Sequence, residues 1–128
     1  MNIPAELKYS KSHEWVKELE DGSVLVGITD YAQDALGDLV FITLPVVGDA
    51  TTTEESFCDV ESIKAVSDVI CPVSGTIAEV NEGLADEPEK LNSEPYEAWI
   101  AKIENITDKG ELLSADEYAA FLETCEEA

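Results

Sequence analysis

The sequence predicts a mainly β protein with short helices, built as a small β-sandwich or barrel-sandwich hybrid and completed by a C-terminal helix. Short runs of β-branched and aromatic residues recur along the chain between turn residues, a spacing typical of small sandwiches and barrels. Helix-start signals are few. With 128 residues and 45% hydrophobic side chains, the chain is expected to form one domain over residues 1–128 with a buried core.

The first elements are a hairpin and a short helix. Runs 15–19 and 23–28 flank Asp21-Gly22, a dipeptide that favours a tight hairpin turn. The next segment, Asp30-Tyr31-Ala32-Gln33, places Asp30 as a helix N-cap with glutamine at the third helical position. Gly37 is expected to end this helix, because glycine adopts the left-handed conformation of a C-cap.

The central elements are strands. The run 39–44 predicts a buried strand that ends at Pro45, because proline cannot donate to a β ladder. Further strand-like runs cover residues 57–60, 65–70, 75–80 and 98–103. The runs within about 57–70 are expected to form one hairpin. Residues 81–92 are expected to hold one further turn or short helix around Leu84 and Leu91.

The last element is a helix over about 115–126. Ser114 to Glu117 has the spacing of a capping box, in which the serine and glutamate side chains bind each other's backbone N–H groups. Apolar residues then recur at helical spacing, at Tyr118, Phe121 and Leu122. A C-terminal helix packed on a β core follows from this pattern.

The charge of the chain excludes several classes of partner. Seven lysines stand against 29 acidic residues, arginine is absent, and the formal net charge is −22. A nucleic-acid binder needs clustered basic residues, and so does a protein that attaches to an anionic membrane surface. We therefore expect neither a nucleic-acid nor a membrane partner. Between Glu18 and Glu89 the only basic residue is Lys64.

The sequence also argues against export and against most self-contained active sites. The N-terminus has no signal-peptide pattern, no apolar run reaches the roughly 20 residues of a membrane span, and three cysteines occur without a C-x-x-C pair. A cytoplasmic protein with reduced cysteines is expected. A single histidine and no glycine-rich phosphate loop leave no metal or nucleotide site. A cysteine-histidine nucleophile pair stays open as an alternative.

Lys64 is the remaining candidate for chemistry. Two strand-like runs meet across Glu61 to Lys64, which places the lysine at or near the tip of the expected hairpin. One interpretation is a solvated turn residue with a weak ion pair to Glu61. The other is a modification site, because an enzyme can reach an exposed tip without unfolding the protein, and acylation converts the lysine into a tether.

The stretch Glu61-Ser62-Ile63-Lys64-Ala65, followed by Cys71-Pro72-Val73-Ser74-Gly75-Thr76-Ile77, resembles the biotinyl/lipoyl carrier superfamily. Ile63 and Ala65 stand where the biotin branch usually has methionine, which favours lipoate. Motifs along the chain narrow the resemblance to the glycine cleavage system H protein family across about residues 7–122. They are Leu7-Lys8-Tyr9, Ser12-His13-Glu14-Trp15, Val26-Gly27-Ile28-Thr29, Ala32-Gln33, Leu36-Gly37-Asp38, Leu44-Pro45, Val60-Glu61-Ser62-Ile63-Lys64-Ala65 and Asn92-Ser93-Glu94-Pro95-Tyr96.

This resemblance implies a lipoyl-domain type of fold and a non-catalytic carrier. Lys64 would bear lipoate in amide linkage, attached by lipoate-attaching enzymes. The carrier would transfer the aminomethyl group of glycine from glycine decarboxylase to aminomethyltransferase. It would then present the dithiol to dihydrolipoamide dehydrogenase. The chemistry would belong to the cofactor and the enzymes, while the carrier, expected to be a monomer, supplies position and recognition.

The resemblance also suggests roles for two carboxylates. Glu14 would lie in a cleft that receives the loaded arm, where it meets the ammonium group and shields the adduct from water. The alternative for Glu14 is a solvated carboxylate at a strand edge. Glu61 would contribute either to recognition by the lipoate-attaching enzyme or to local turn stability. Cys58, which the expected register places opposite about Asp68, is interpreted as a small strand residue, although an outward thiol would permit exchange with the lipoyl disulfide.

Two positions depart from the family pattern. Tyr31 stands where many members have histidine, and the segment Pro95 to Trp99 lacks a glycine and is one residue short. Two other functions stay open: an H-like lipoyl donor or relay that serves other proteins or a redox pathway, and an acidic interaction module with unmodified Lys64.

Overall fold

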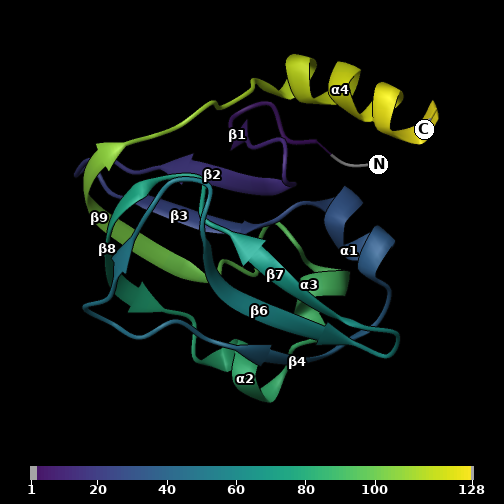
Figure 1. Ribbon diagram of the computed structural model, residues 1–128, viewed down its shortest axis with the longest axis horizontal. Coiled ribbons are helices and arrows are strands. Elements are labelled where there is room, and N and C mark those ends of the chain that lie inside the picture. Colours follow the sequence, from purple (N-terminus) through teal and green to yellow (C-terminus); the bar gives the residue numbers. More distant parts are fainter. Residues whose placement is uncertain (1–2, 128) are drawn as a thin grey trace.

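The computed structural model describes residues 3–127, with side chains described through Thr124. Two antiparallel sheets face each other, and short helices cover one end of them (Figure 1). The elements in chain order are β1 (Lys8–Tyr9), β2 (Glu14–Glu18), β3 (Val24–Ile28), α1 (Asp30–Leu36), β4 (Leu39–Thr43), β5 (Ala50–Thr51), β6 (Ser56–Ser62), β7 (Val66–Ile70), β8 (Ser74–Val80), α2 (Gly83–Asp86), α3 (Lys90–Ser93), β9 (Ala101–Asp108) and α4 (Ala115–Glu127).

The larger sheet has the order β1-β2-β3-β9-β8-β5, and the smaller has the order β4-β6-β7. Alternating side chains of both sheets meet between them and form the main core, which includes Val26, Val60, Ile77 and Ile103. This arrangement confirms the predicted class of a mainly β sandwich with short helices and a C-terminal helix.

A second, smaller core lies under α4. The helix crosses the β1 side of the larger sheet, as Figure 1 shows, and buries Tyr118 and Leu122 against Leu7, Tyr9 and Trp15. The rings of Tyr9 and Tyr118 stack with centroids 4.7 Å apart. The predicted capping box is present: Ser114 N donates to Glu117 Oε1 at 2.9 Å, and Glu117 N donates to Ser114 Oγ at 3.2 Å.

Several local predictions need correction. The N-cap of α1 is Thr29 and not Asp30, because Thr29 Oγ1 accepts a hydrogen bond from Ala32 N at 3.2 Å. Residues 81–92 hold two short helices instead of one. The last strand begins at Ala101 and not at residue 98. Just before it, Ile100 N donates a hydrogen bond to Val26 O at 2.7 Å.

The prediction of a buried strand over 39–44 is also wrong in part. Leu39 and Ile42 are buried, but Val40 and Phe41 are exposed. A register shift between Leu39 and Phe41 places two β4 residues opposite one of β6, so Val40 is an extra residue that turns away from the core. The outer face of the small sheet is open to solvent, and Phe41 lies on it.

One close contact fixes the segment that carries Glu14. Trp15 is buried and its Nε1 donates to Pro95 O at 2.9 Å. Its ring lies on Gly27 of the neighbouring strand, where an added Cβ would stand 2.6 Å from ring atoms of Trp15. Glycine is therefore required at residue 27 for the tryptophan to lie flat against β3.

Gly27→Ala is expected to lower the free energy of unfolding by about 1–3 kcal/mol, because the methyl group overpacks against a buried ring. Urea unfolding measures the change. Gly83→Ala is the matched control, since a Cβ there meets only Asn81 Oδ1 at 3.4 Å. An equal loss in both variants would contradict the packing argument.

Candidate functional site

Lys64 is the middle residue of the three-residue loop Ile63-Lys64-Ala65 that joins β6 and β7. Ser62 N donates to Ala65 O at 2.8 Å, which closes the hairpin. The Ser62 hydroxyl oxygen also accepts from Lys64 N at 3.3 Å and from Ala65 N at 3.2 Å. One buried serine therefore holds the backbone on both sides of the lysine, while the lysine side chain stays exposed.

The loop length corrects the predicted register. Glu61 pairs with Val66 and Asp59 with Asp68, so Cys58 lies opposite Val69 and not opposite Asp68. From Cys58 to Glu61 the hairpin is centred between Ile63 and Lys64, half a residue later than expected, so each partner moves by one position; the register shifts again between Cys58 and Ser56.

The side chain of Lys64 runs along the C-terminal end of α1. Gly37, the C-cap, has φ of 83°, and a Cβ built on it would lie 3.7 Å from Lys64 Cε and 3.9 Å from Nζ. The last carbonyls of a helix carry partial negative charge, which favours an ammonium group, and α1 has no basic residue of its own in the last turn.

Asn92 holds the elements beside this lysine together. Its Nδ2 donates to Gly37 O at 2.9 Å and to Gln33 Oε1 at 3.1 Å, and its Oδ1 accepts from Leu39 N at 2.8 Å. One amide of α3 thus joins the end of α1 to the start of β4. The hairpin tip is tied to the same place, because Ile63 N donates to Asp38 O at 3.2 Å.

A cavity of about 140 Å³, which we call the Glu14 cleft, lies between α1, β7 and the segment before β2. Apolar groups form most of its wall, and the polar residues Ser12, Glu14, Ser67 and Asp68 are among those that line it. Its lining residues are Ser12, His13, Glu14, Ile28, Tyr31, Ala32, Ala35, Leu36, Val60, Ser67, Asp68 and Val69. Lys64 is outside this lining.

Glu14 is buried at the edge of the cleft, so the alternative of a solvated strand-edge carboxylate is wrong. Burial raises the pKa of Glu14 to about 7, although hydrogen bonds from Ser12, Ser10 and the backbone of Ile70 oppose the shift. Ser10 Oγ and Ser12 Oγ donate to Glu14 Oε1 at 2.7 and 2.6 Å. The carboxyl group is therefore partly protonated at neutral pH and held in one orientation.

His13 and Tyr31 form another wall of the cleft. His13 has φ of 74° and its Nδ1 lies 2.9 Å from the hydroxyl of Tyr118, which lies 2.8 Å from Thr29 Oγ1. Burial lowers the pKa of His13. The ring of Tyr31 packs on His13 with centroids 4.5 Å apart, so the departure from the family pattern places a tyrosine against this histidine.

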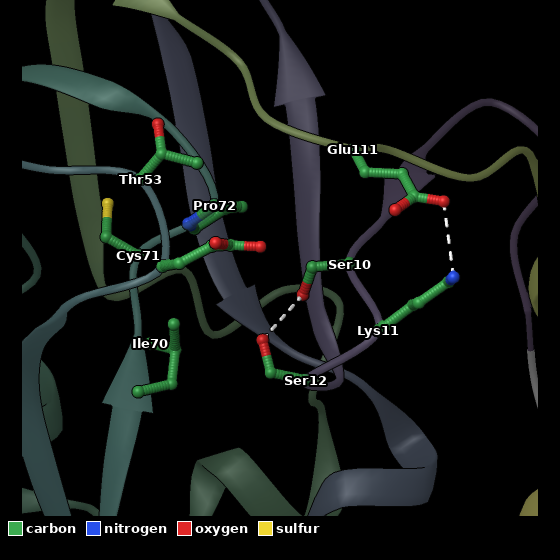
Figure 2. Close-up of a pocket in the computed structure, with 9 residues that line it drawn as sticks. Ser10, Lys11, Ser12, Thr53, Ile70, Cys71, Pro72 and Glu111 are labelled. Carbon is green, nitrogen blue, oxygen red and sulfur yellow. Dashed lines mark hydrogen bonds and ion pairs between the residues drawn. The ribbon is translucent and has the colours of Figure 1, made fainter.

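A larger cavity of about 330 Å³ lies on the other side of the serine pair (Figure 2). Figure 2 shows Ser10 and Ser12 directed toward each other across 3.3 Å, with the ion pair of Lys11 and Glu111 at 3.2 Å along the rim. None of the predicted site residues lines this cavity, but the two serines that bind Glu14 do.

The predicted residues do not form one compact site. Lys64 lies at the hairpin tip beside α1, Glu14 lies in the cleft, and Glu61 is exposed on the outer face of the small sheet. No ion pair joins Lys64 to Glu61. The sequence analysis assigned no role to Ser10, Ser62 or Asn92. Ser62 and Asn92 belong to motifs shared with the H-protein family, whereas no pattern in the sequence singles out Ser10.

Other chemistries find little support among the described side chains. Through Thr124, no three histidine, cysteine, aspartate or glutamate side chains gather in a group that would bind a metal ion. Cys58 and Cys71 are buried free thiols whose pKa values burial raises, so neither has the character of a nucleophile. Cys125 lies outside the described side chains. No helix within residues 3–127 is long and apolar enough to cross a membrane.

Comparison with known proteins identifies the family. The sequence pattern described as Glycine cleavage H-protein matches residues 7–125. The chain belongs to this family. The glycine cleavage system H protein of Lachnoclostridium phytofermentans is 57% identical over 122 residues, which cover 95% of this chain and 96% of that protein. The probable glycine cleavage system H protein of Pyrococcus furiosus is 58% identical, with coverage of 95% and 93%.

A solved structure agrees with the family assignment. The crystal structure of a glycine cleavage system H protein from Mycobacterium marinum superimposes with a TM-score of 0.89 at 44% identity and covers 94% of this chain and 99% of that one. Several H-protein motifs quoted above contribute residues to the cleft and to the surroundings of Lys64, including Glu14, Ala32, Gly37 and Asn92.

The buried carboxyl group should make stability depend on pH. The ordinary pKa of 4.5 returns on unfolding, whereas the folded value is about 7. Between these values the native chain binds the extra proton, so the contribution of Glu14 is fully present below about pH 4.5 and is lost as the pH rises through 7. Relative to Glu14→Gln, the wild-type free energy of unfolding should fall by about 2.5 kcal/mol between pH 5 and 8.

Urea unfolding at both pH values measures this difference. Glu104→Gln, which removes an exposed carboxylate, is the control and should keep the wild-type pH dependence. If Glu14→Gln also keeps it, Glu14 does not titrate in this range.

Proposed function

We propose that the protein is the lipoyl-carrying shuttle of a glycine cleavage system, with lipoate attached through an amide to Lys64 Nζ. The observation that carries this proposal is the presentation of Lys64: an exposed side chain on a hairpin loop whose backbone is fixed by Ser62. Membership of the glycine cleavage H-protein family supports it independently.

The residues around Lys64 and Glu14 fit such a group. The lysine is free of ion pairs among the described side chains, so acylation removes no existing contact of that kind. The Glu14 cleft offers an apolar wall for a hydrocarbon arm together with polar groups for a charged end. When bound, lipoate would supply a disulfide that takes up the aminomethyl group of glycine on one sulfur while the other becomes a thiol, and the dithiol would form only after that group has been passed on.

The partners in this proposal are three enzymes and a modifying enzyme. Glycine decarboxylase loads the carrier, aminomethyltransferase unloads it, and dihydrolipoamide dehydrogenase reoxidises it, while a lipoate-attaching enzyme first modifies Lys64. The protein itself acts as a single-domain, monomeric, non-catalytic carrier in the cytoplasm. Tethering makes each encounter depend on docking of the carrier rather than on the concentration of free cofactor.

Within this proposal, Glu14 binds and protects an ammonium group in the cleft. Ser10 and Ser12 orient its carboxyl group through two short hydrogen bonds to the same oxygen. An approaching cation favours the ionised form of a carboxyl group, so binding would lower the raised pKa of Glu14. The apolar wall limits access of water, which slows hydrolysis of a bound adduct.

Lys64→Arg is expected to abolish modification, because a guanidinium group is not a nucleophile toward an activated acyl group at neutral pH. Incubation with a lipoate–protein ligase, ATP and lipoate, followed by intact mass spectrometry, should show one lipoyl group on the wild type and none on Lys64→Arg. Lys17→Arg, an exposed lysine on β2, is the control and should be modified like the wild type. A lipoyl group on Lys64→Arg would exclude Lys64 as the attachment site.

Glu14→Ala should leave lipoylation intact but shorten the half-life of the aminomethyl-loaded carrier by roughly ten- to a hundredfold, the range expected for loss of a charge-assisted contact. Release of formaldehyde and ammonia from the loaded protein measures the half-life. Glu104→Ala serves as the control for loss of a carboxylate elsewhere. An unchanged half-life in Glu14→Ala would remove Glu14 from the proposed cleft function.

A further inference from the structure

The helix α4 reaches the wall of the Glu14 cleft through one hydroxyl group. Tyr118 of α4 is fully buried, and its hydroxyl oxygen lies 2.8 Å from Thr29 Oγ1 and 2.9 Å from His13 Nδ1. Thr29 is the N-cap of α1, and His13 lines the cleft. We call this pair of contacts the Tyr118 bridge. It joins α4 to two segments that contribute residues to the cleft.

His13 has a backbone conformation that needs support from its surroundings. Its φ of 74° lies in the left-handed region, which is uncommon for residues other than glycine and persists where neighbouring contacts hold it. His13 N donates to Ser10 O at 3.1 Å, and Thr29 N donates to His13 O at 3.1 Å. The residues on either side of His13 then meet, since Ser12 Oγ donates to Glu14 Oε1 at 2.6 Å.

The ring of His13 packs among three aromatic side chains. Tyr31 of α1 lies with its centroid 4.5 Å away, and Tyr118 and Phe121 of α4 lie at 5.9 and 6.0 Å. The titratable groups that face this ring are therefore two tyrosines, one from each helix, together with Glu14, the next residue along the chain. None of the ion pairs among the described side chains includes His13. The Tyr118 hydroxyl is the polar group that fixes the rotation of the ring.

One assignment of the hydrogens satisfies every group in the Tyr118 bridge. Thr29 is fully buried, and its hydroxyl oxygen already accepts from Ala32 N at 3.2 Å, so its own hydrogen is directed to Tyr118. The Tyr118 hydroxyl then donates to His13 Nδ1, and a ring nitrogen that accepts carries no hydrogen. His13 is therefore neutral with its hydrogen on Nε2, in agreement with the lowered pKa that burial gives this ring.

We propose that Tyr118 is a positioning residue of the Glu14 cleft, because its hydroxyl group fixes the ring, the tautomer and the left-handed backbone of His13. His13 in turn holds Ser12 and Glu14 in the orientation that meets an ammonium group. The inference rests on the proposed function. Tyr118 does not line the cleft, so it acts through His13 and not on the bound group. The helix α4 then serves the carrier function as well as the second core.

Tyr118→Phe tests the bridge, because it removes the hydroxyl group and keeps the ring that stacks on Tyr9. His13 is the only histidine in the sequence, so heteronuclear NMR of its ring nitrogens reads the tautomer and the titration without overlap. The wild type should show the Nε2–H tautomer at neutral pH. In Tyr118→Phe, Nδ1 loses its donor, so the ring should become a mixture of tautomers and its pKa should rise.

The matched control is Tyr9→Phe, which removes a hydroxyl group that donates to Pro4 O in the same second core. It should keep the wild-type NMR signals of His13, because Tyr9 makes no hydrogen bond to the bridge. Urea unfolding establishes that each variant is folded.

The second readout is the lifetime of the loaded carrier. Lipoylated Tyr118→Phe should lose its aminomethyl group about three- to tenfold faster than the wild type, the effect expected for loss of one neutral hydrogen bond. The rate of lipoylation should stay unchanged, because Lys64 lies outside the cleft. Tyr9→Phe should match the wild type in both measurements.

Each outcome is decisive. A changed tautomer together with a shorter half-life in Tyr118→Phe, both absent in Tyr9→Phe, supports the positioning role. A wild-type tautomer in Tyr118→Phe overturns it, and so does a changed tautomer with an unchanged half-life. An equal loss of half-life in both tyrosine variants also overturns it, because the loss then reflects packing of the second core. A wild-type chain that cannot be lipoylated overturns the proposed function and the positioning role with it, whereas NMR of the unmodified chain still decides whether the bridge fixes His13.

Discussion

The side-chain amide of Asn92 is the interaction on which the arrangement around Lys64 depends. Its three hydrogen bonds reach the end of α1 and the start of β4, and the backbone of Asp38 between these elements then binds Ile63 at the hairpin tip. The lysine loop is therefore fixed relative to α1, and α1 forms a wall of the Glu14 cleft. One half-buried polar group sets the relative position of the lysine and the cleft.

The sequence predicted those features that local patterns determine. The tight turn after Glu20, the capping box at Ser114 and the strands on either side of Lys64 all follow from residue periodicity and turn chemistry. Two features of β4 depend on the place of this strand in its sheet: the exposure of Phe41 and the bulge at Val40, where two β4 residues face one residue of β6. The periodicity of apolar residues in the sequence does not predict that place. The function of Ser10 was equally invisible, because its partner Glu14 is identified only by the folded geometry.

A buried carboxyl group in a chain of net charge −22 is costly, and the structure shows how the cost is reduced. Two serine hydroxyl groups and a backbone hydrogen bond act on Glu14, and they offset only part of the effect of burial on its pKa. The pKa of Glu14 therefore stays above its ordinary value. In the proposed function, this incompletely compensated carboxyl group is what an ammonium group would meet in the cleft.

The separation between the lysine loop and the cleft has a thermodynamic consequence. Because Ser62 and the β6–β7 pairing hold the hairpin through backbone atoms, attachment of a group to Nζ leaves the fold unchanged. If Lys64 carries lipoate as proposed, a gain in folding stability on modification would come from contacts that the far end of the arm makes with the protein. Loss of the ammonium group beside the C-terminal end of α1 acts in the opposite direction, so occupancy of the cleft would appear as a melting temperature above that of the chain acylated on Lys64 by a short acyl group.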